Sequence, residues 1–91
     1  MQVEYKGKIY STKYFPFFRI KRKDGYQVFG IRYPSGSIER VIVFDTPNYM
    51  KELNDYLLFL IKEYLYEDDE ALTPFAKRLK EDIYELFGEE R

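Results

Sequence analysis

The dipeptide Asp24-Gly25 stands between two segments rich in aromatic and β-branched residues, Lys13–Arg22 and Tyr26–Tyr33. Asp-Gly suits the two left-handed positions of a type I′ turn, which joins neighbouring antiparallel strands. A second turn is indicated at Tyr33-Pro-Ser-Gly-Ser37, where Pro fits a type I turn and Gly fits the left-handed bulge residue after it. This spacing predicts three antiparallel strands, the third over Ser37–Phe44.

The second half of the chain carries helical periodicity instead. Asp45 or Thr46 can cap a first helix whose opening turn accommodates Pro47, and apolar residues follow at helical spacing through to about Tyr66. The dipeptide Thr73-Pro74 opens a second helix. The apolar stripes consist of Met50, Leu53, Leu57, Leu60, Ile61 and Tyr64 in the first helix, and of Phe75, Leu79, Ile83 and Leu86 in the second.

We therefore predict an α+β fold in which an antiparallel sheet of three to four strands occupies the N-terminal half and packs on two C-terminal helices. A further strand or hairpin is expected within Gln2–Tyr10, turning near Lys6-Gly7-Lys8. A chain of 91 residues supports one compact core, and no Gly/Ser-rich or Pro-rich linker interrupts it. Residues 1–91 are thus expected to form a single domain, with the sheet in 1–44 and the helices in 45–91.

Charge is distributed unevenly between these halves. The formal net charge is −1, yet the segment up to Asp45 holds nine Lys and Arg against four Asp and Glu, and the remainder holds six against twelve. A basic sheet half and an acidic helical half are therefore predicted. Many charged residues, few glutamines and no Cys also resemble the composition of proteins from hot environments.

The sequence contains neither Cys nor His. This excludes thiol nucleophiles, disulfides, Cys/His zinc sites and imidazole bases. The acidic run Glu67–Glu70 lacks the alternating ligand spacing and the Gly of a calcium loop. We predict that the protein is not an enzyme and that it needs no metal or other cofactor.

The first residues of the chain are charged and carry no apolar stretch typical of a secretory signal. The longest apolar run, Tyr56–Ile61, is far shorter than the ~18–20 residues of a membrane span. We expect a soluble, cytoplasmic protein without a membrane partner.

The turns also predict which residues oppose each other. A two-residue turn at Asp24-Gly25 pairs Lys21 with Val28 and Ile20 with Phe29, and opposed side chains share a face of the sheet. The face predicted to be buried receives Phe18, Ile20, Phe29, Ile31, Val41 and Val43. Glu39 falls on this face opposite Ile31, so it needs a partner or a place at the sheet margin.

The opposite face gathers cations from three strands, together with Val28 and Ile42, which are expected to be exposed there. Gly30 lies at its centre, and the missing side chain allows close approach. Arg, Lys and Tyr side chains there can contact phosphates, sugars and base edges. The alternative explanation is that these cations only keep an exposed sheet soluble. The candidate nucleic-acid-binding residues are Arg19, Lys21, Lys23, Tyr26, Arg32 and Arg40.

The segment Phe18–Tyr64 combines an Arg-Lys-Asp-Gly turn at Arg22–Gly25, a Tyr-Pro-Ser-Gly turn at Tyr33–Gly36, and a helix that opens at Thr46. In this it resembles the arm-type DNA-binding domain at the N-terminus of tyrosine recombinases. The resemblance implies a three-stranded sheet, backed by a helix, whose exposed face enters the DNA major groove. It would place these side chains against DNA: Arg19, Lys21, Tyr26, Arg32 and Arg40.

We predict a small nucleic-acid-binding protein that contacts duplex DNA, rather than RNA, with the basic sheet face. A second hypothesis is a protein-interaction module, such as an inhibitor or adaptor from a mobile element, that uses the acidic helical half or forms a homodimer through the first helix. The apolar surface of that helix exceeds a ~100° stripe, so the second helix or a partner subunit must cover the rest. The additional apolar residues are Leu58, Phe59, Leu65 and Tyr66.

Overall fold

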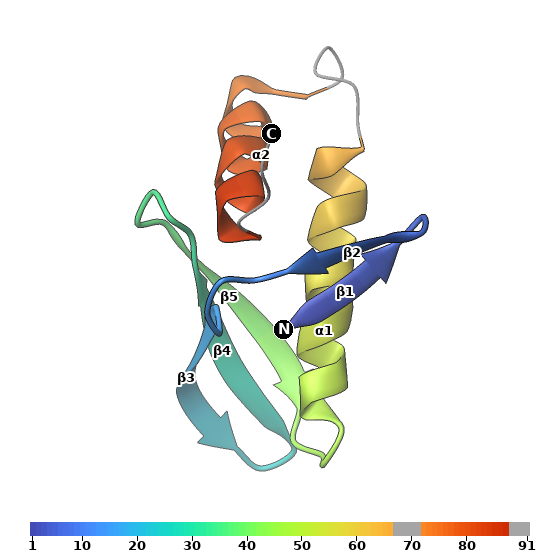
Figure 1. Cartoon of the computed structure of the whole chain (residues 1–91). Coiled ribbons are helices and arrows are strands. Elements are labelled where there is room, and N and C mark those ends of the chain that lie inside the picture. The colour runs from blue at the N-terminus through green and yellow to red at the C-terminus, as the bar shows by residue number, and fades with distance from the viewer. Residues whose placement is uncertain (67–71, 88–91) are drawn as a thin grey trace.

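The computed structural model of the chain describes residues 1–66 and 72–87. Two antiparallel sheets and two helices make up the fold (Figure 1). The elements are β1 (Gln2–Tyr5), β2 (Lys8–Ser11), β3 (Phe17–Lys23), β4 (Tyr26–Arg32), β5 (Ile38–Phe44), α1 (Tyr49–Leu60), the π-helical turn η1 (Ile61–Leu65) and α2 (Pro74–Leu86). The predicted α+β class is confirmed, and the N-terminal hairpin forms a sheet of its own beside the three-stranded sheet β3-β4-β5. The acidic run Glu67–Glu70 lies outside the described residues.

The β1–β2 turn and the β3–β4 turn each contain a glycine but differ in backbone conformation. In the β1–β2 turn both Lys6 (φ 50°) and Gly7 (φ 77°) are left-handed, as a type I′ turn requires. In the β3–β4 turn Gly25 is left-handed (φ 89°) but Asp24 is not, so the predicted type I′ turn there is wrong. The two-residue loop is nevertheless present, because Lys23 pairs with Tyr26 as expected.

The β4–β5 connection forms as predicted. The Gly36 amide donates a hydrogen bond to the Tyr33 carbonyl at 2.9 Å, and Gly36 has a φ of 97°. Arg32 then pairs with Ile38 and Gly30 with Arg40, which confirms the expected register along the whole of β5.

The β3–β4 register departs from the prediction at Ile20. A β-bulge between Arg19 and Lys21 leaves Ile20 unpaired, so that Arg19 lies opposite Phe29 and Phe18 opposite Gly30. An inserted residue moves every side chain beyond it to the other face of the sheet. Phe18 and Ile20, predicted to be buried in the core, are therefore not core residues, and Ile20 is 39% exposed.

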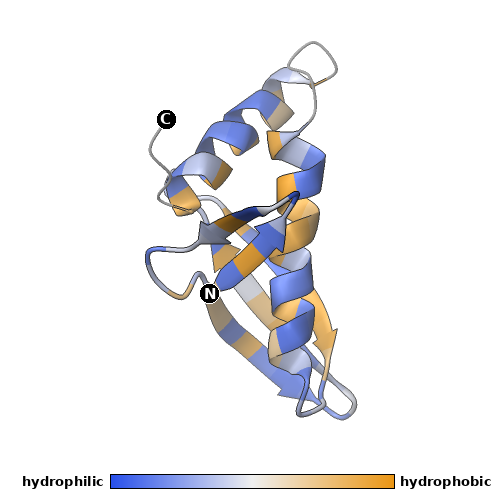
Figure 2. Cartoon of the chain, turned by 45° about the vertical axis from the view of Figure 1, so that its right-hand side comes forward, coloured by the Kyte–Doolittle hydropathy of each residue, from blue (hydrophilic) through white to orange (hydrophobic). Residues whose placement is uncertain are grey.

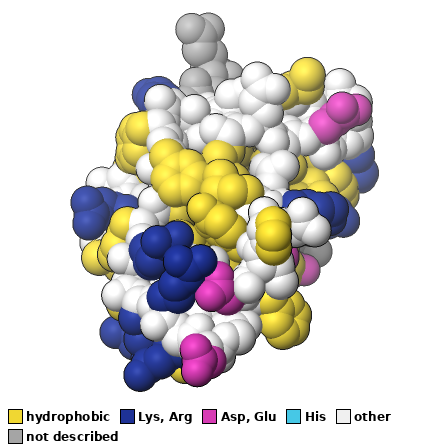
Figure 3. All heavy atoms as spheres, turned by 90° about the horizontal axis from the view of Figure 1, so that it is seen from below, with side chains coloured by type: hydrophobic (Ala, Val, Ile, Leu, Met, Phe, Trp, Pro, Cys, Tyr) yellow, Lys and Arg dark blue, Asp and Glu magenta, His cyan; other side chains and the backbone are white. Residues whose placement is uncertain are grey.

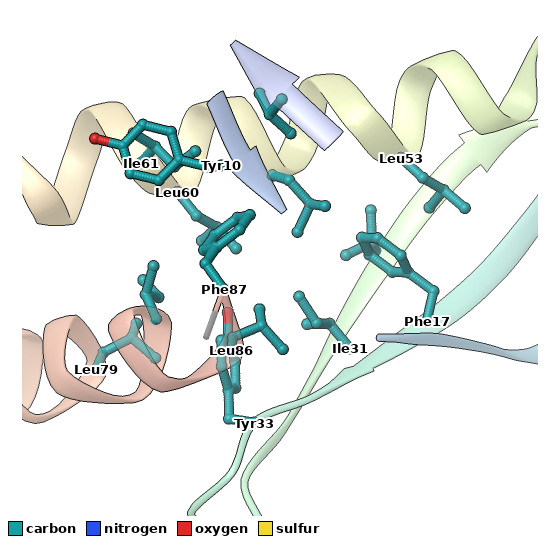
Figure 4. Close-up of a cluster of buried hydrophobic side chains, with 14 of the residues drawn as sticks. Tyr10, Phe17, Ile31, Tyr33, Leu53, Leu60, Ile61, Leu79, Leu86 and Phe87 are labelled. Atoms are coloured by element: carbon teal, nitrogen blue, oxygen red, sulfur yellow. The ribbon is translucent and has the colours of Figure 1, made fainter. Parts of the chain in front are cut away.

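The core lies between the inner face of the three-stranded sheet, the two helices and the β1–β2 hairpin. Figure 4 shows side chains from all these elements converging, and the rings of Tyr10 and Phe87 meet edge to face with their centroids 5.8 Å apart. Of the residues predicted for the sheet core, Phe29, Ile31, Val41 and Val43 are buried there. The bulge brings Phe17 into the position that Phe18 was expected to fill.

Helix α1 begins after Asn48, three residues beyond Asp45, and no side chain caps it. Thr46 instead accepts a hydrogen bond from the Asn48 amide at 3.3 Å, and Pro47 lies ahead of the first turn. Helix α2 follows the prediction more closely, since the Thr73 hydroxyl accepts a hydrogen bond from the Ala76 amide at 3.2 Å. Leu79, Ile83 and Leu86 are buried, but Phe75 is 68% exposed and does not belong to the buried stripe.

The wide apolar surface of the first helix is covered largely within the chain. The β1–β2 hairpin packs against α1 and α2 packs against η1, and the rings of Tyr5 and Tyr66 meet edge to face at 4.9 Å. Met50 and Phe59 remain 40% and 46% exposed. At about 100° per residue they point in opposite directions, so they form no common patch. A homodimer through α1 stays a prediction.

No helix among the described residues is long and apolar enough to cross a membrane.

Candidate nucleic-acid interface

The outer face of the three-stranded sheet is the side turned away from the core. Along β4, Gln27, Phe29 and Ile31 point inward and are buried, so the alternate residues point outward. Figures 1 and 2 show α1 and the β1–β2 hairpin on the inner side, and α2 beside the end of the sheet that carries the β4–β5 turn. Strand pairing then gives the outer face these residues: Phe18, Lys21, Lys23, Tyr26, Val28, Gly30, Arg32, Ile38, Arg40, Ile42 and Phe44.

Four of the five predicted cations lie together on this outer face. Lys21 and Lys23 come from β3, Arg32 from β4 and Arg40 from β5, and all four are exposed. Glu39 is the only acidic residue in the three strands, and it points to the inner side opposite Ile31. The outer face of the sheet is therefore free of acidic side chains within its strands.

Arg19 does not join the other cations. Because of the bulge it lies opposite Phe29 on the inner side, where its guanidinium group stands 5.7 Å from the centre of the Phe29 ring. That ring stacks in turn on Tyr49, with centroids 5.7 Å apart. The prediction that Arg19 belongs to the basic face is wrong, since it assumed an uninterrupted β3.

The centre of the outer face is closed. A Cβ atom at Gly30 would lie 2.4 Å from Cζ of Phe18, so the Phe18 ring occupies the space that the missing side chain leaves. The Arg32 guanidinium group lies 5.0 Å from the centre of the same ring. Gly30 thus makes room for Phe18 and not for a ligand. Val28, predicted to be exposed, is only 5% exposed, and Tyr26 is half-buried.

Large apolar side chains stand among the cations. Ile42 is 70% exposed, as the register predicted, and Phe44 and Ile38 are 69% and 54% exposed. Sequence reasoning did not include Phe44 and Ile38 in the site, although the alternation along β5 could have placed them beside Ile42. Figure 2 shows β5 as largely hydrophobic, and Figure 3, which views the molecule from below, shows Lys and Arg side chains beside both apolar and acidic ones.

One cation of β3 is neutralised on the inner side. Arg22 donates hydrogen bonds from Nε and Nη2 to the two carboxylate oxygens of Asp45, at 3.0 and 2.8 Å. Gln27 Nε2 donates to the same carboxylate at 3.1 Å. The hydrogen bonds from Arg22 lower the pKa of the Asp45 carboxyl, and Asp45 raises the pKa of Arg22. Arg22 therefore joins the sheet to the β5–α1 connection.

Glu39 has the partner that its inward position requires. The hydroxyl of Tyr33 donates to Glu39 Oε2 at 3.2 Å. Burial raises the pKa of the Tyr33 hydroxyl, and the negative charge and hydrogen bond of Glu39 raise it further.

Comparisons with family models, curated proteins and solved structures give no match for this chain. The resemblance to the arm domain of tyrosine recombinases stays a prediction. Among the described residues no group of three or more Asp and Glu is placed to hold a metal ion.

Proposed function

We propose that this protein binds duplex DNA through the outer face of β3–β5. The observation that supports this best is a sheet face that carries cations from all three strands and, within those strands, no acidic side chain. Cations on such a surface neutralise phosphates, and Arg32 and Arg40 have the donor geometry for guanine edges. The proposed contact residues are Lys21, Lys23, Arg32 and Arg40, with Tyr26 at the margin.

The dimensions of the sheet suit the major groove. Three strands at ~4.8 Å spacing are about 10 Å across, and the B-DNA major groove is ~12 Å wide. The major groove of A-form RNA is narrow and deep, so the same sheet would not enter it. Exposed Ile42 and Phe44 would then contact thymine methyl groups, which are apolar features of that groove.

The charge count limits the strength of binding. Each neutralised phosphate contributes about −0.9 to the slope of log affinity against log salt concentration. Four cations therefore predict a slope of about −3 to −4 if every one contacts a phosphate. Binding should be clear at low salt and weak at physiological salt.

Fluorescence anisotropy of a labelled 20-base-pair duplex, measured over a range of salt concentrations, tests the proposal. The variant Lys21→Glu/Arg40→Glu should lose at least tenfold in affinity at low salt. The matched control is Lys77→Glu/Arg78→Glu, which makes the same charge change on exposed positions of α2 and should bind like the wild type. Equal loss in both double variants, or no binding by the wild type at low salt, would contradict the proposal. Stronger binding to a single strand of the same sequence would favour base stacking on Tyr26 instead.

A further inference from the structure

A hollow of the described surface lies away from the centre of the basic face, where the β4–β5 turn meets α2. It has a volume of about 550 Å³, within the ~300–1,000 Å³ range of small-molecule sites. Both sides of the hollow, β5 and α2, contribute apolar as well as acidic side chains. The apolar side chains are Ile38, Phe75 and Leu79, and the acidic ones are Glu39, Glu81 and Asp82.

Hydrogen bonds hold two of these carboxylates in place. Ser35 Oγ donates to Asp82 Oδ2 at 2.5 Å and so joins the turn to the helix across the cleft. Glu39 is held in the same way by the buried hydroxyl of Tyr33. A carboxylate has about four lone-pair sites, so each retains acceptor capacity for a further donor.

The charge of the cleft favours a cation. Three carboxylates face one basic lining residue, Arg78. The exposed ring of Phe75 stands at the cleft and adds the face of an aromatic ring, which also attracts cations. A bare metal ion fits poorly, because hard cations need about six or more oxygen ligands and no described group of acids is placed to hold one.

We propose that this cleft binds an organic cation, an ammonium or guanidinium group carried on an apolar chain. The charged group would contact Asp82 and Glu81, and the chain would lie against Ile38, Phe75 and Leu79. Such a group is presented by a Lys or Arg side chain of a protein partner or by a free alkylamine. Both sources present the same charged group on an apolar chain. A protein partner would add contacts from its neighbouring residues, whereas a free alkylamine would not.

An NMR titration of the ¹⁵N-labelled full chain with butylammonium tests this. The amide signals of Ser35, Ser37 and the α2 residues around Asp82 should shift and saturate, with a Kd on the order of millimolar for so small a ligand. Butanol has the same chain without the charge, and butyrate has the opposite charge, and neither should saturate these signals. Equal shifts with butanol and butylammonium would overturn the proposal.

Two variants separate a charge effect from a loss of folding. Asp82→Asn keeps an acceptor for Ser35 and removes the charge, and Glu81→Gln removes the charge of an exposed side chain. Each should weaken butylammonium binding about two- to fivefold, the usual range for an exposed ion pair. Glu85→Gln makes the same change on α2 outside the cleft and should leave the Kd unchanged. Unchanged binding in both cleft variants would overturn the proposal.

A capped tetrapeptide with one Lys beside Leu identifies the source. Binding at least tenfold tighter than butylammonium assigns the cleft to a protein partner. Binding that only equals butylammonium assigns it to a free amine. Failure of both ligands to bind overturns the cation site and leaves the DNA proposal untouched, because none of the cleft carboxylates belongs to the outer sheet face.

Discussion

The inner and outer faces of the β3–β5 sheet are built from the same three strands with different chemistry. The inner face buries Phe29, Ile31 and Val41 and pairs its charged groups, with Arg22 on Asp45 and Glu39 on Tyr33. The outer face leaves its cations exposed beside Ile42 and Phe44. The Arg22–Asp45 and Tyr33–Glu39 contacts of the inner face stabilise the fold, whereas the cations of the outer face are available to a partner.

The largest difference between the faces should appear on truncation of an isoleucine. Ile31→Ala removes a side chain with no exposed surface, and it should lower the free energy of unfolding by about 2–5 kcal/mol. Ile42→Ala removes one that is 70% exposed, and its effect should stay within about 0.5 kcal/mol. Urea denaturation followed by circular dichroism measures both. Similar losses would mean that the outer face is covered in solution by a second molecule.

The contribution of the buried Tyr33 hydroxyl, which is hydrogen-bonded to Glu39, to the free energy of unfolding should depend on pH in the alkaline range. The pKa of Tyr33 is raised on folding, so its contribution to stability is complete below the unfolded pKa of ~10 and is lost as the pH rises above that value. Relative to Tyr33→Phe, the wild type should lose up to about 1.4 kcal/mol of unfolding free energy per pH unit above pH 10. Urea denaturation at pH 9, 10 and 11 measures the difference in unfolding free energy between the two proteins. The same pH dependence in both would contradict a buried, hydrogen-bonded Tyr33 hydroxyl.

Gly30→Ala tests the packing of Phe18 on the outer face. The added methyl group must displace the ring, which covers the glycine as aromatic residues do in other sheets, at a cost of about 1 kcal/mol. Combined with Phe18→Ala, the same change should be close to neutral, because the obstacle is gone. A double-mutant cycle by urea denaturation measures the coupling. Additive losses would mean that Phe18 does not lie over Gly30.

The smallest effect is expected from the exposed ion pair of Arg22 and Asp45. The pKa of Asp45 is lowered on folding, so its contribution is complete above the unfolded value of 3.8 and is lost as the pH falls from there through the lower pKa of the folded state. Asp45→Asn should therefore be slightly less stable than the wild type at pH 7 and should approach it at pH 3. Thermal melts at the two pH values measure this. The same difference in melting temperature between the two proteins at pH 7 and at pH 3 would exclude the Asp45 carboxylate as the cause of the stability difference.

The contrast between the two hairpins of this sheet explains what could be predicted from sequence. Pro34 and Gly36 specify one loop conformation, and the register of β5 follows from it without interruption. In β3 the adjacent residues Phe17 and Phe18 are equally suited to the core, so alternation alone cannot decide which of them is buried. The bulge at Ile20 resolves this in favour of Phe17, and Arg19 leaves the basic face as a result.

The cleft between the β4–β5 turn and α2 was not predicted for a different reason. It depends on the hydrogen bond between Ser35 and Asp82, which are 47 positions apart. No local pattern reports the approach of two such segments. The exposed position of Phe75 is likewise decided by how α2 packs, since its spacing fits the buried stripe.

Chemical-shift mapping with a short DNA duplex tests the central claim most directly, because it reports on each face of the sheet separately. At low salt, the amide signals of Lys21, Arg32 and Arg40 should shift together, while the side-chain Nε signal of Arg19 on the inner side stays in place. Shifts that gather on Arg19 and the helices, or a spectrum unchanged by DNA at low salt, would contradict a DNA-binding outer face.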